Sequence, residues 1–215
     1  MVYLKAAERE DQIVASAVTV LSNVGVAAMT LRAVAAEAGV SLGTVQYIFP
    51  AKDQLLHAVI TRVIRDISDA LRPELMPGKG VEHVLRDGVT GFWEKLVDHR
   101  VGLQIMQYEL LAYSVRKDHD SLAQQQYASY TSVVAEFCEQ AARAAGERCA
   151  VGFDTLGRLV LAQVDGLILQ YIAKPDTHRA HRDLEHALDM LVAYADPQPM
   201  APRATRRKPK DGTAD

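Results

Sequence analysis

The chain has few of the features that mark a secreted, membrane-embedded or disulfide-stabilised protein. Its 215 residues include only two cysteines, Cys138 and Cys149, and their separation fits neither a metal site nor a redox motif. No apolar run approaches the roughly 20 residues that a membrane-spanning helix needs. The N-terminal sequence MVYLKAAERED lacks the basic and then apolar order of a signal peptide. These absences predict a cytoplasmic protein with reduced thiols and no membrane partner.

Patterns typical of β-sheets and of enzymes are also missing. No segment sustains the alternation of apolar and polar residues that predicts a strand. The sequence contains no glycine-rich phosphate loop, no Gly-x-Ser-x-Gly elbow and no His-Glu-x-x-His motif. His178, His181 and His186 are spaced by three and five residues, which does not keep them on one helical face. We therefore expect neither enzymatic activity nor a cofactor or metal, and we interpret these histidines as a solvated surface.

Helical periodicity, by contrast, runs through almost the whole chain. Hydrophobic residues make up 49% of the sequence and charged residues 24%, a balance typical of a globular protein. Apolar residues that recur every three and four positions predict an all-α fold. After a polar arm, we expect about nine helices, over residues 11–24, 30–38, 42–49, 51–71, 81–98, 101–115, 119–145, 153–173 and 176–195.

The end of the chain has a different composition. Three prolines lead into RATRRKPKDGTAD, which contains five cations and two acids and so carries a net charge of +3. Such a segment has too little apolar surface to fold. We predict a disordered basic tail over residues 197–215.

The stretch TLRAVAAEAGVSLGTVQYIF, from Thr30 to Phe49, is where the pattern is most specific. Thr30 and Ser41 stand where N-caps are expected, because their hydroxyls can accept from backbone amides of the first helical turn. Gly39 stands where a left-handed residue ends the first of the two helices. Two short helices joined by so tight a turn are typical of a helix-turn-helix, although an ordinary helical hairpin would share this pattern.

Residues 9–56 as a whole resemble the TetR family of bacterial one-component regulators. The resemblance rests on Gly25, Thr30, Ala35-Ala36, Ala38-Gly39-Val40-Ser41, Gly43-Thr44 and Phe49-Pro50-x-Lys52. It implies a homodimer that binds a palindromic operator in double-stranded DNA and is released by a small-molecule effector. Residues 1–52 would then form a three-helix DNA-binding domain, and residues 53–196 a larger helical domain for ligand binding and dimerisation.

The resemblance also implies which residues meet DNA. They are Thr30, Arg32, Ser41, Leu42, Gly43, Thr44, Gln46, Tyr47 and Lys52. The chemistry of these residues fits that role: Gly43 lets the backbone approach the duplex, and the methyl of Thr44 can meet a thymine. Gln46 can pair bidentately with adenine. Thr30, Arg32 and Lys52 are expected to contact phosphate, Lys52 from the start of the fourth helix.

The candidate ligand site is made of polar and aromatic residues on neighbouring helices. These residues are Trp93, Gln104, Gln107, Tyr108, Tyr113, Tyr127, Tyr130 and Asp165. Small-molecule sites often combine aromatic walls with a few polar groups, but the tyrosines would serve equally well as core residues with hydroxyls at the surface. Asp165 stands in an apolar segment and needs a partner. It is expected to cap a neighbouring helix, to pair across a dimer interface or to face a cationic ligand.

The last two helices are expected to build the dimer interface. Gly166 lies inside a predicted helix, where glycine costs about 1 kcal/mol relative to alanine, so another backbone is expected to come close to it. Leu184, Leu188, Leu191 and Ala195 form one apolar stripe on the final helix. Together they are consistent with a four-helix bundle between two subunits. The alternative function is a helical partner-binding or small-molecule-binding protein without DNA binding, which would leave the Gly39-Val40-Ser41 turn unexplained.

The charge of the DNA-binding part yields a first prediction. Residues 1–52 contain four cations and four acids, and Leu42 and Gln46 replace the cation and the tyrosine of most relatives. Operator affinity should therefore fall only shallowly with salt, because few phosphates are neutralised. Titration of an operator duplex at several salt concentrations measures this slope. A log–log slope steeper than about −8 would contradict the expectation, because it requires about nine neutralised phosphates.

Overall fold

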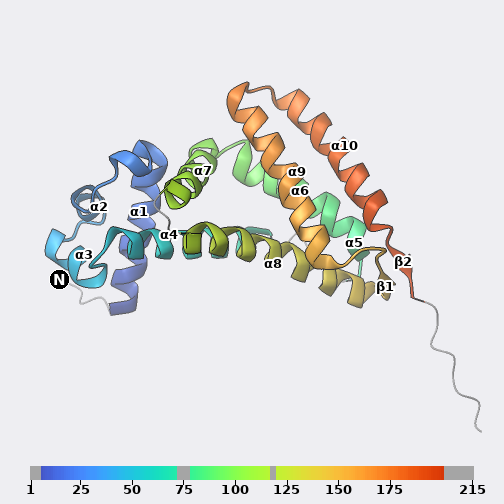
Figure 1. Ribbon diagram of the computed structural model, residues 1–215, viewed down its shortest axis with the longest axis horizontal. Coiled ribbons are helices and arrows are strands. Elements are labelled where there is room, and N and C mark those ends of the chain that lie inside the picture. The colour runs from blue at the N-terminus through green and yellow to red at the C-terminus, as the bar shows by residue number, and fades with distance from the viewer. Residues whose placement is uncertain (1–5, 72–77, 117–119, 201–215) are drawn as a thin grey trace, which may run out of the picture.

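The computed structural model describes residues 6–71, 78–116 and 120–200, and these ranges are almost entirely helical (Figure 1). The first helices are α1 (Ala6–Ala28), α2 (Leu31–Glu37), α3 (Leu42–Ile48) and α4 (Lys52–Leu71). Alternating α and π turns then form one continuous rod of α5 (Gly80–His83), η2 (Val84–Gly88), α6 (Val89–Phe92) and η3 (Trp93–Val97). The remaining helices are α7 (Val101–Arg116), α8 (Asp120–Ala145), α9 (Phe153–Ala173) and α10 (Thr177–Ala195). With that rod taken as one helix, the described ranges confirm the predicted all-α fold of about nine helices.

The start of the first helix differs from the prediction. α1 begins at Ala6, so residues 6–11 of the predicted arm (residues 1–11) are helical, and residues 1–5 lie outside the described part of the chain. The alanine, glutamate and arginine residues of this arm are strong helix formers, but they carry no apolar periodicity that would reveal the helix. The helix is interrupted at Gly25, which adopts φ 79° and turns the chain toward α2. Glycine is favoured there because other residues rarely adopt that conformation.

A short strand pair also departs from the expectation of no sheet. β1 (Glu147–Arg148) pairs antiparallel with β2 (Gln198–Pro199), and the amide of Met200 donates to the Gly146 carbonyl at 2.7 Å. Two-residue strands are too short to show an alternating pattern. Residues 198–200, predicted as part of the disordered tail, therefore pair with the segment that directly follows α8. Residues 201–215 of that predicted tail lie outside the described part of the chain.

The helices enclose two apolar cores. The first unites α1, α2 and α3 with α4 and with Leu103, Met106 and Leu110 of α7. The second is formed by the η2–η3 rod together with α8, α9 and α10. The first core therefore joins the N-terminal helices to α7, which also carries Gln104 and Gln107, two of the predicted ligand-binding residues.

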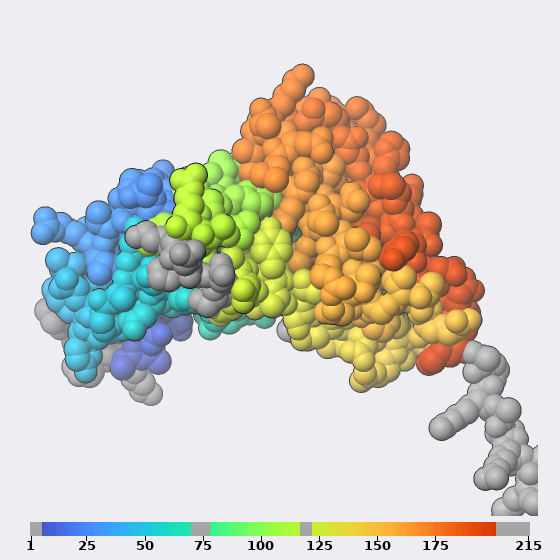
Figure 2. Space-filling model, in the orientation of Figure 1, coloured from blue at the N-terminus to red at the C-terminus, as the bar shows by residue number. Residues whose placement is uncertain are grey.

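Viewed as a whole, the molecule is elongated. In Figures 1 and 2 the N-terminal helices occupy one end, and α9 and α10 stand at the other, with α8 running between them. α1 and α9 are long and apolar enough, by composition alone, to cross a membrane. α1 contributes its apolar side chains to the first core, and α9 contributes its apolar side chains to the second.

The structure corrects the prediction that one stripe of α10 forms the dimer interface. Leu184, Leu188, Leu191 and Ala195 are all buried in the second core of the same chain, so none of them is available to a partner. The amphipathic pattern of α10 indicates burial, but it does not distinguish a core from an interface.

Two glycines on α9 differ in how closely the rest of the chain approaches them. A Cβ added at Gly166 would meet no atom of the described residues within 4 Å outside its own stretch of helix, so the approach of a partner's backbone to Gly166 stays a prediction. Within the chain, the close approach lies at Gly157, where a Cβ would stand 2.8 Å from the Thr131 carbonyl oxygen. Gly157 is thus the position at which α8 and α9 come together.

Candidate functional site

The turn between α2 and α3 has the geometry that its sequence predicts. Thr30 Oγ1 accepts from the Ala33 amide at 3.1 Å, and Ser41 Oγ accepts from the Thr44 amide at 3.1 Å. Gly39 adopts φ 63°, in the left-handed region, and ends α2. Gln12 of α1 donates to the Ala38 carbonyl at 2.7 Å and so fixes α1 against the turn. The predicted helix-turn-helix is therefore present, with both caps formed.

One face of α3 is open to solvent. Gly43, Gln46 and Tyr47 are exposed, Tyr47 to 87%, whereas Val45 on the opposite face is fully buried. A Cβ at Gly43 would come no closer than 3.7 Å to its nearest neighbour, so packing in this chain does not require glycine there. The exposed face of α3 therefore offers an amide, a phenol and an accessible backbone to an external partner.

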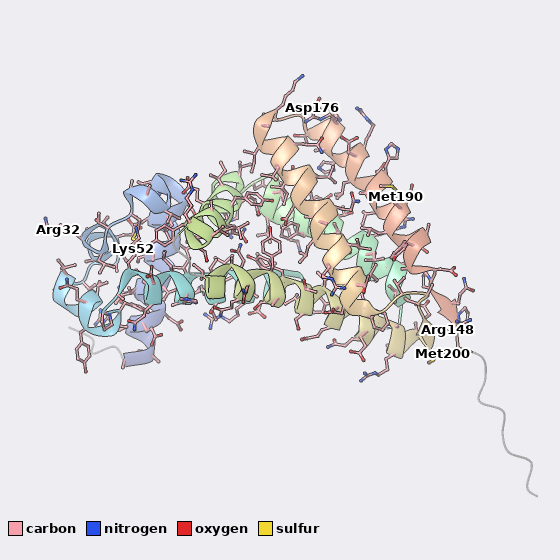
Figure 3. All side chains as sticks on the ribbon, in the orientation of Figure 1. Arg32, Lys52, Arg148, Asp176, Met190 and Met200 are labelled. Atoms are coloured by element: carbon pink, nitrogen blue, oxygen red, sulfur yellow. The ribbon has the colours of Figure 1, made fainter. Side chains whose placement is uncertain are left out.

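Other residues predicted to contact DNA surround this face. Thr30 and Arg32 at the start of α2 are exposed, and Figure 3 shows Arg32 pointing away from the body of the protein. Leu42 and Thr44 are half-buried. Thr44 Oγ1 lies 2.8 Å from Ser41 Oγ, so its hydroxyl already belongs to the helix cap and its methyl is the group left for contact.

Lys52 is placed differently from its predicted role as a phosphate clamp. Its Nζ donates to the carbonyls of Val26 at 2.9 Å and Met29 at 3.2 Å, and it lies 5.7 Å from the centre of the Tyr113 ring. The side chain thus points inward and binds the backbone between α1 and α2 (Figure 3). Sequence position alone could not show this, because a lysine at a helix N-terminus can turn to either side.

The same backbone segment is also held from α7, by a residue that the sequence analysis missed. Glu109 accepts a hydrogen bond from the Val26 amide at 2.8 Å, and a Cβ at Gly25 would lie only 2.7 Å from its carboxylate. Tyr113, one turn further along α7, donates to Asp53 at the start of α4 at 3.2 Å. Residues 26–29, which precede the DNA-facing helices, are therefore clamped between α4 and α7.

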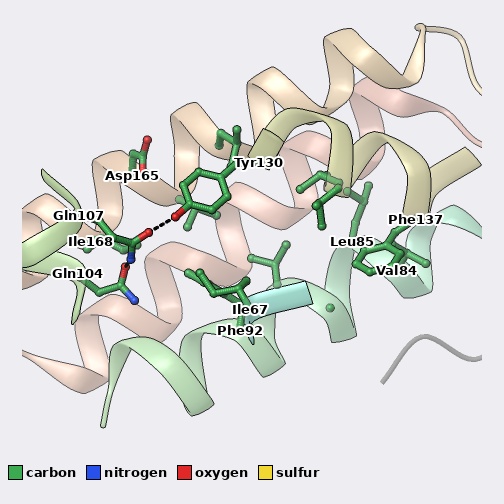
Figure 4. Close-up of a pocket in the computed structure, with 16 residues that line it drawn as sticks. Ile67, Val84, Leu85, Phe92, Gln104, Gln107, Tyr130, Phe137, Asp165 and Ile168 are labelled. Carbon is green, nitrogen blue, oxygen red and sulfur yellow. Dashed lines mark hydrogen bonds between the residues drawn. The ribbon is translucent and has the colours of Figure 1, made fainter. Parts of the chain in front are cut away.

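A cavity of about 110 Å³ lies inside the second domain (Figure 4). Four of its lining residues are polar, namely Gln104, Gln107, Tyr130 and Asp165, and all four belong to the predicted ligand set. The walls are otherwise apolar and are formed by Ile67, Val84, Leu85, Gly88, Val89, Phe92, Val133, Val134, Phe137, Leu161, Val164 and Ile168. The sequence analysis missed these residues because an apolar cavity wall and an apolar core have the same helical pattern.

The other four predicted ligand residues lie outside the cavity wall. Trp93 is fully buried, donates from its indole nitrogen to Asp98 at 3.1 Å and packs edge-on against Tyr171. Tyr113 belongs to the clamp described above. Tyr108 and Tyr127 do not line the cavity, but each donates a hydrogen bond to Asp165, which does.

Asp165 is held by these two tyrosines. Tyr108 donates to its Oδ1 at 3.1 Å and Tyr127 donates to its Oδ2 at 2.8 Å. Burial raises the pKa of the Asp165 carboxyl, and the two tyrosine hydrogen bonds oppose that rise. The pKa values of both tyrosines are raised in turn, mainly by burial and also by the nearby carboxylate. Among the described residues, therefore, Asp165 caps no helix.

The remaining polar groups form a hydrogen-bonded row. Tyr130 donates to Gln107, Gln107 donates to Gln104 at 3.0 Å, and Gln104 donates to the Leu96 carbonyl at 3.1 Å. The row and Asp165 gather at one end of the cavity, and the other end is apolar (Figure 4). Such a site suits a small molecule with one polar end and an apolar body.

Comparisons with known proteins agree with this architecture. Residues 13–59 match the family model described as bacterial regulatory proteins of the tetR family. The chain is 26% identical over 196 residues to the nicotine-responsive transcriptional repressor HdnoR of Paenarthrobacter nicotinovorans, a match that covers 90% of this chain and 97% of HdnoR. It is also 26% identical to the transcriptional regulator BetI of Paraburkholderia phymatum, with 87% of this chain and 94% of BetI covered.

A solved structure extends the likeness to the whole fold. A protein of Rhodococcus sp. assigned to the TetR family of transcriptional regulators superposes with a TM-score of 0.73. The match covers 88% of this chain and 99% of that protein, at 23% sequence identity. The capped helix-turn-helix, the exposed face of α3, the helical second domain and these matches lead to one assignment. Residues 13–59 carry the DNA-binding domain of the tetR family of bacterial regulatory proteins, and the chain as a whole is similar to DNA-binding transcriptional regulators of that family.

Proposed function

We propose that this protein is a cytoplasmic repressor that binds a palindromic operator as a homodimer and leaves it when a small molecule fills the second-domain cavity. The observation that carries the proposal is the exposed face of α3, where Gly43, Gln46 and Tyr47 stand on a helix held by a capped turn. A second helix in this setting is suited to the major groove. Arg32 and Thr30 then lie at the edge of that face, where they meet phosphates.

The cavity supports the ligand-responsive part of the proposal. It is a mostly apolar cavity with a few polar groups at one end, which is the usual composition of a small-molecule site. HdnoR, a relative that aligns along most of the chain, is named for its response to nicotine.

A second prediction concerns base recognition by α3. Gln46→Ala should weaken binding to an operator duplex by about 1–3 kcal/mol and relax the preference at one base pair, because a bidentate contact to adenine is lost. Fluorescence anisotropy on a duplex recovered by selection measures both effects. Gln140→Ala, at an exposed glutamine of α8, is the matched control and should bind as wild type does. If Gln46→Ala keeps wild-type affinity and preference, α3 is not the reading helix.

The proposed dimer uses the outer faces of α9 and α10. Four of the nine large hydrophobic side chains that are exposed in the described chain lie there, namely Leu159, Leu169, Met190 and Tyr194. Leu159, Gly166 and Leu169 are spaced by seven and three residues, so they share one face of α9, and the open space at Gly166 allows a second backbone to approach. This outer face replaces the buried stripe of α10 as the proposed interface, and it would form a four-helix bundle with a second copy.

Leu169→Asp should therefore produce a monomer in analytical ultracentrifugation, because a carboxylate would be buried without a partner in the bundle. Leu169 is 52% exposed in the single chain, so the substitution should leave the fold intact. Val115→Asp, at a 58% exposed valine of α7, is the matched control and should remain dimeric. A Leu169→Asp protein that sediments as a dimer would place the interface elsewhere.

The clamp on residues 26–29 is the proposed link between the two sites. α7 carries Gln104 and Gln107 at the cavity and Glu109 at the Val26 amide, so a ligand that shifts α7 also moves the support of the DNA-facing helices. A ligand that binds one arrangement of α7 more tightly would shift the population toward it.

Removal of this link should loosen the N-terminal helices. In Glu109→Ala, amide exchange at residues 26–52 should be faster by about fivefold, which corresponds to the loss of about 1 kcal/mol from one hydrogen bond. Exchange in α9 and α10 should stay unchanged. Glu136→Ala, at an exposed glutamate of α8, provides the control for loss of a surface carboxylate. Unchanged exchange at residues 26–52 would show that Glu109 does not hold them.

A further inference from the structure

The charge distribution around the cavity identifies what kind of molecule it accepts. Of the residues that line the cavity, Asp165 is the only one with an ionisable acidic or basic side chain at neutral pH. Within the described ranges, no lysine, arginine or histidine lies in salt-bridge distance of it. Its partners are the neutral hydroxyls of Tyr108 and Tyr127. An ionised Asp165 thus leaves the cavity with one uncompensated negative charge.

Asp165 is half-buried, and a carboxylate that is partly removed from water without a counter-ion destabilises a fold unless something else requires it. The two tyrosines orient Asp165 and favour its ionised form, but each supplies only one neutral donor. A carboxylate has about four lone-pair positions, so acceptor capacity remains on the side that lines the cavity. Asp165 therefore has no positively charged partner among the described residues, and its free acceptor positions are on the side of the cavity, where a ligand would lie.

The rest of the polar end has matching chemistry. Tyr130 donates its hydroxyl hydrogen to Gln107, so the polar row beside Asp165 consists of neutral groups and supplies no positive charge. The opposite end is lined by Val84, Leu85 and Phe137, and Phe92 lies along the wall (Figure 4). Aromatic faces attract cations as well as apolar groups. One end of the cavity thus suits a donor that carries positive charge, and the other suits an apolar body.

We infer that the cavity binds an apolar monocation, namely an amine or quaternary ammonium compound, with Asp165 as its counter-ion. This inference rests on the proposed function, because it names the ligand class of the same cavity. A ligand with a carboxylate or phosphate would meet a like charge in a medium of low dielectric and is excluded. A neutral ligand of the same shape would leave Asp165 without a counter-ion and should bind more weakly.

The test uses four probes that share one benzene ring and differ in charge. Benzylammonium and benzyltrimethylammonium are cations, benzyl alcohol is neutral and benzoate is an anion. Isothermal titration calorimetry of the full chain near neutral pH should show binding of at least one cation in preference to the alcohol, and no binding of benzoate. In Asp165→Asn the cation should bind about tenfold or more weakly, because a charge-assisted contact is lost, whereas the alcohol should bind as before.

Two controls separate this result from a structural effect. Asp154→Asn removes an exposed carboxylate from the same helix, outside the cavity, and should leave cation binding unchanged. Asp165→Asn should unfold at a temperature no lower than that of wild type, because burial disfavours the charge that it removes. If Asp165→Asn is less stable than wild type but binds the cation equally well, Asp165 serves only to pack α7 and α8 on α9, and the inference is wrong.

The remaining outcomes are also decisive. Equal binding of the alcohol and the cations by wild type, or no binding of either cation, would overturn the inference. Operator binding is measured on the same preparations without any probe. A protein that binds its operator but no cation refutes the ligand class alone, and one that binds cations but no selected DNA refutes the proposed function alone.

Discussion

The backbone from Val26 to Met29 is held from two sides, and the position of the DNA-facing helices depends on how it is held. Lys52 binds its carbonyls from α4, and Glu109 binds the Val26 amide from α7. The left-handed Gly25 lies against the Glu109 carboxylate, where a Cβ would clash. A short linker with its polar backbone groups fixed by two charged side chains transmits movement better than a flexible one would. The three N-terminal helices are therefore joined to α4 and α7 by these hydrogen bonds and by a shared apolar core.

The cavity combines two properties that stability alone does not explain. It is an unfilled space beside a well-packed core, and it holds a carboxylate whose pKa is raised by burial. A core selected only for stability would contain neither, since cavities, and carboxylates held away from water without a counter-ion, both lower the free energy of unfolding. Both properties have a function if a molecule of opposite charge fills the space.

Sequence reasoning predicted the N-terminal part more fully than the second domain. The caps at Thr30 and Ser41 and the turn at Gly39 are local, and local patterns depend on few residues. The direction of Lys52 was not predictable, because it depends on where Val26 and Met29 lie after folding. The same holds for α10, since the stripe of Leu184 and Leu188 would look the same against its own core or against a partner.

In the cavity, the polar residues were predicted better than the walls. Gln104, Gln107, Tyr130 and Asp165 attract attention because polar groups in apolar helices need partners, and all four line the cavity. Trp93 and Tyr113 have the same chemical character, but their partners, Asp98 and Asp53, lie elsewhere. The sequence did not predict the apolar residues of the cavity wall, because whether packed helices leave a space between them depends on tertiary geometry.

The central claim is that two copies of α3 read one symmetrical site on DNA. Footprinting of the tightest duplex selected from a random pool tests it most directly. We predict a protected inverted repeat whose half-sites lie about one helical turn apart, or a small multiple of that distance. A selection that enriches no sequence, or a footprint on a single unrepeated site, would contradict the account.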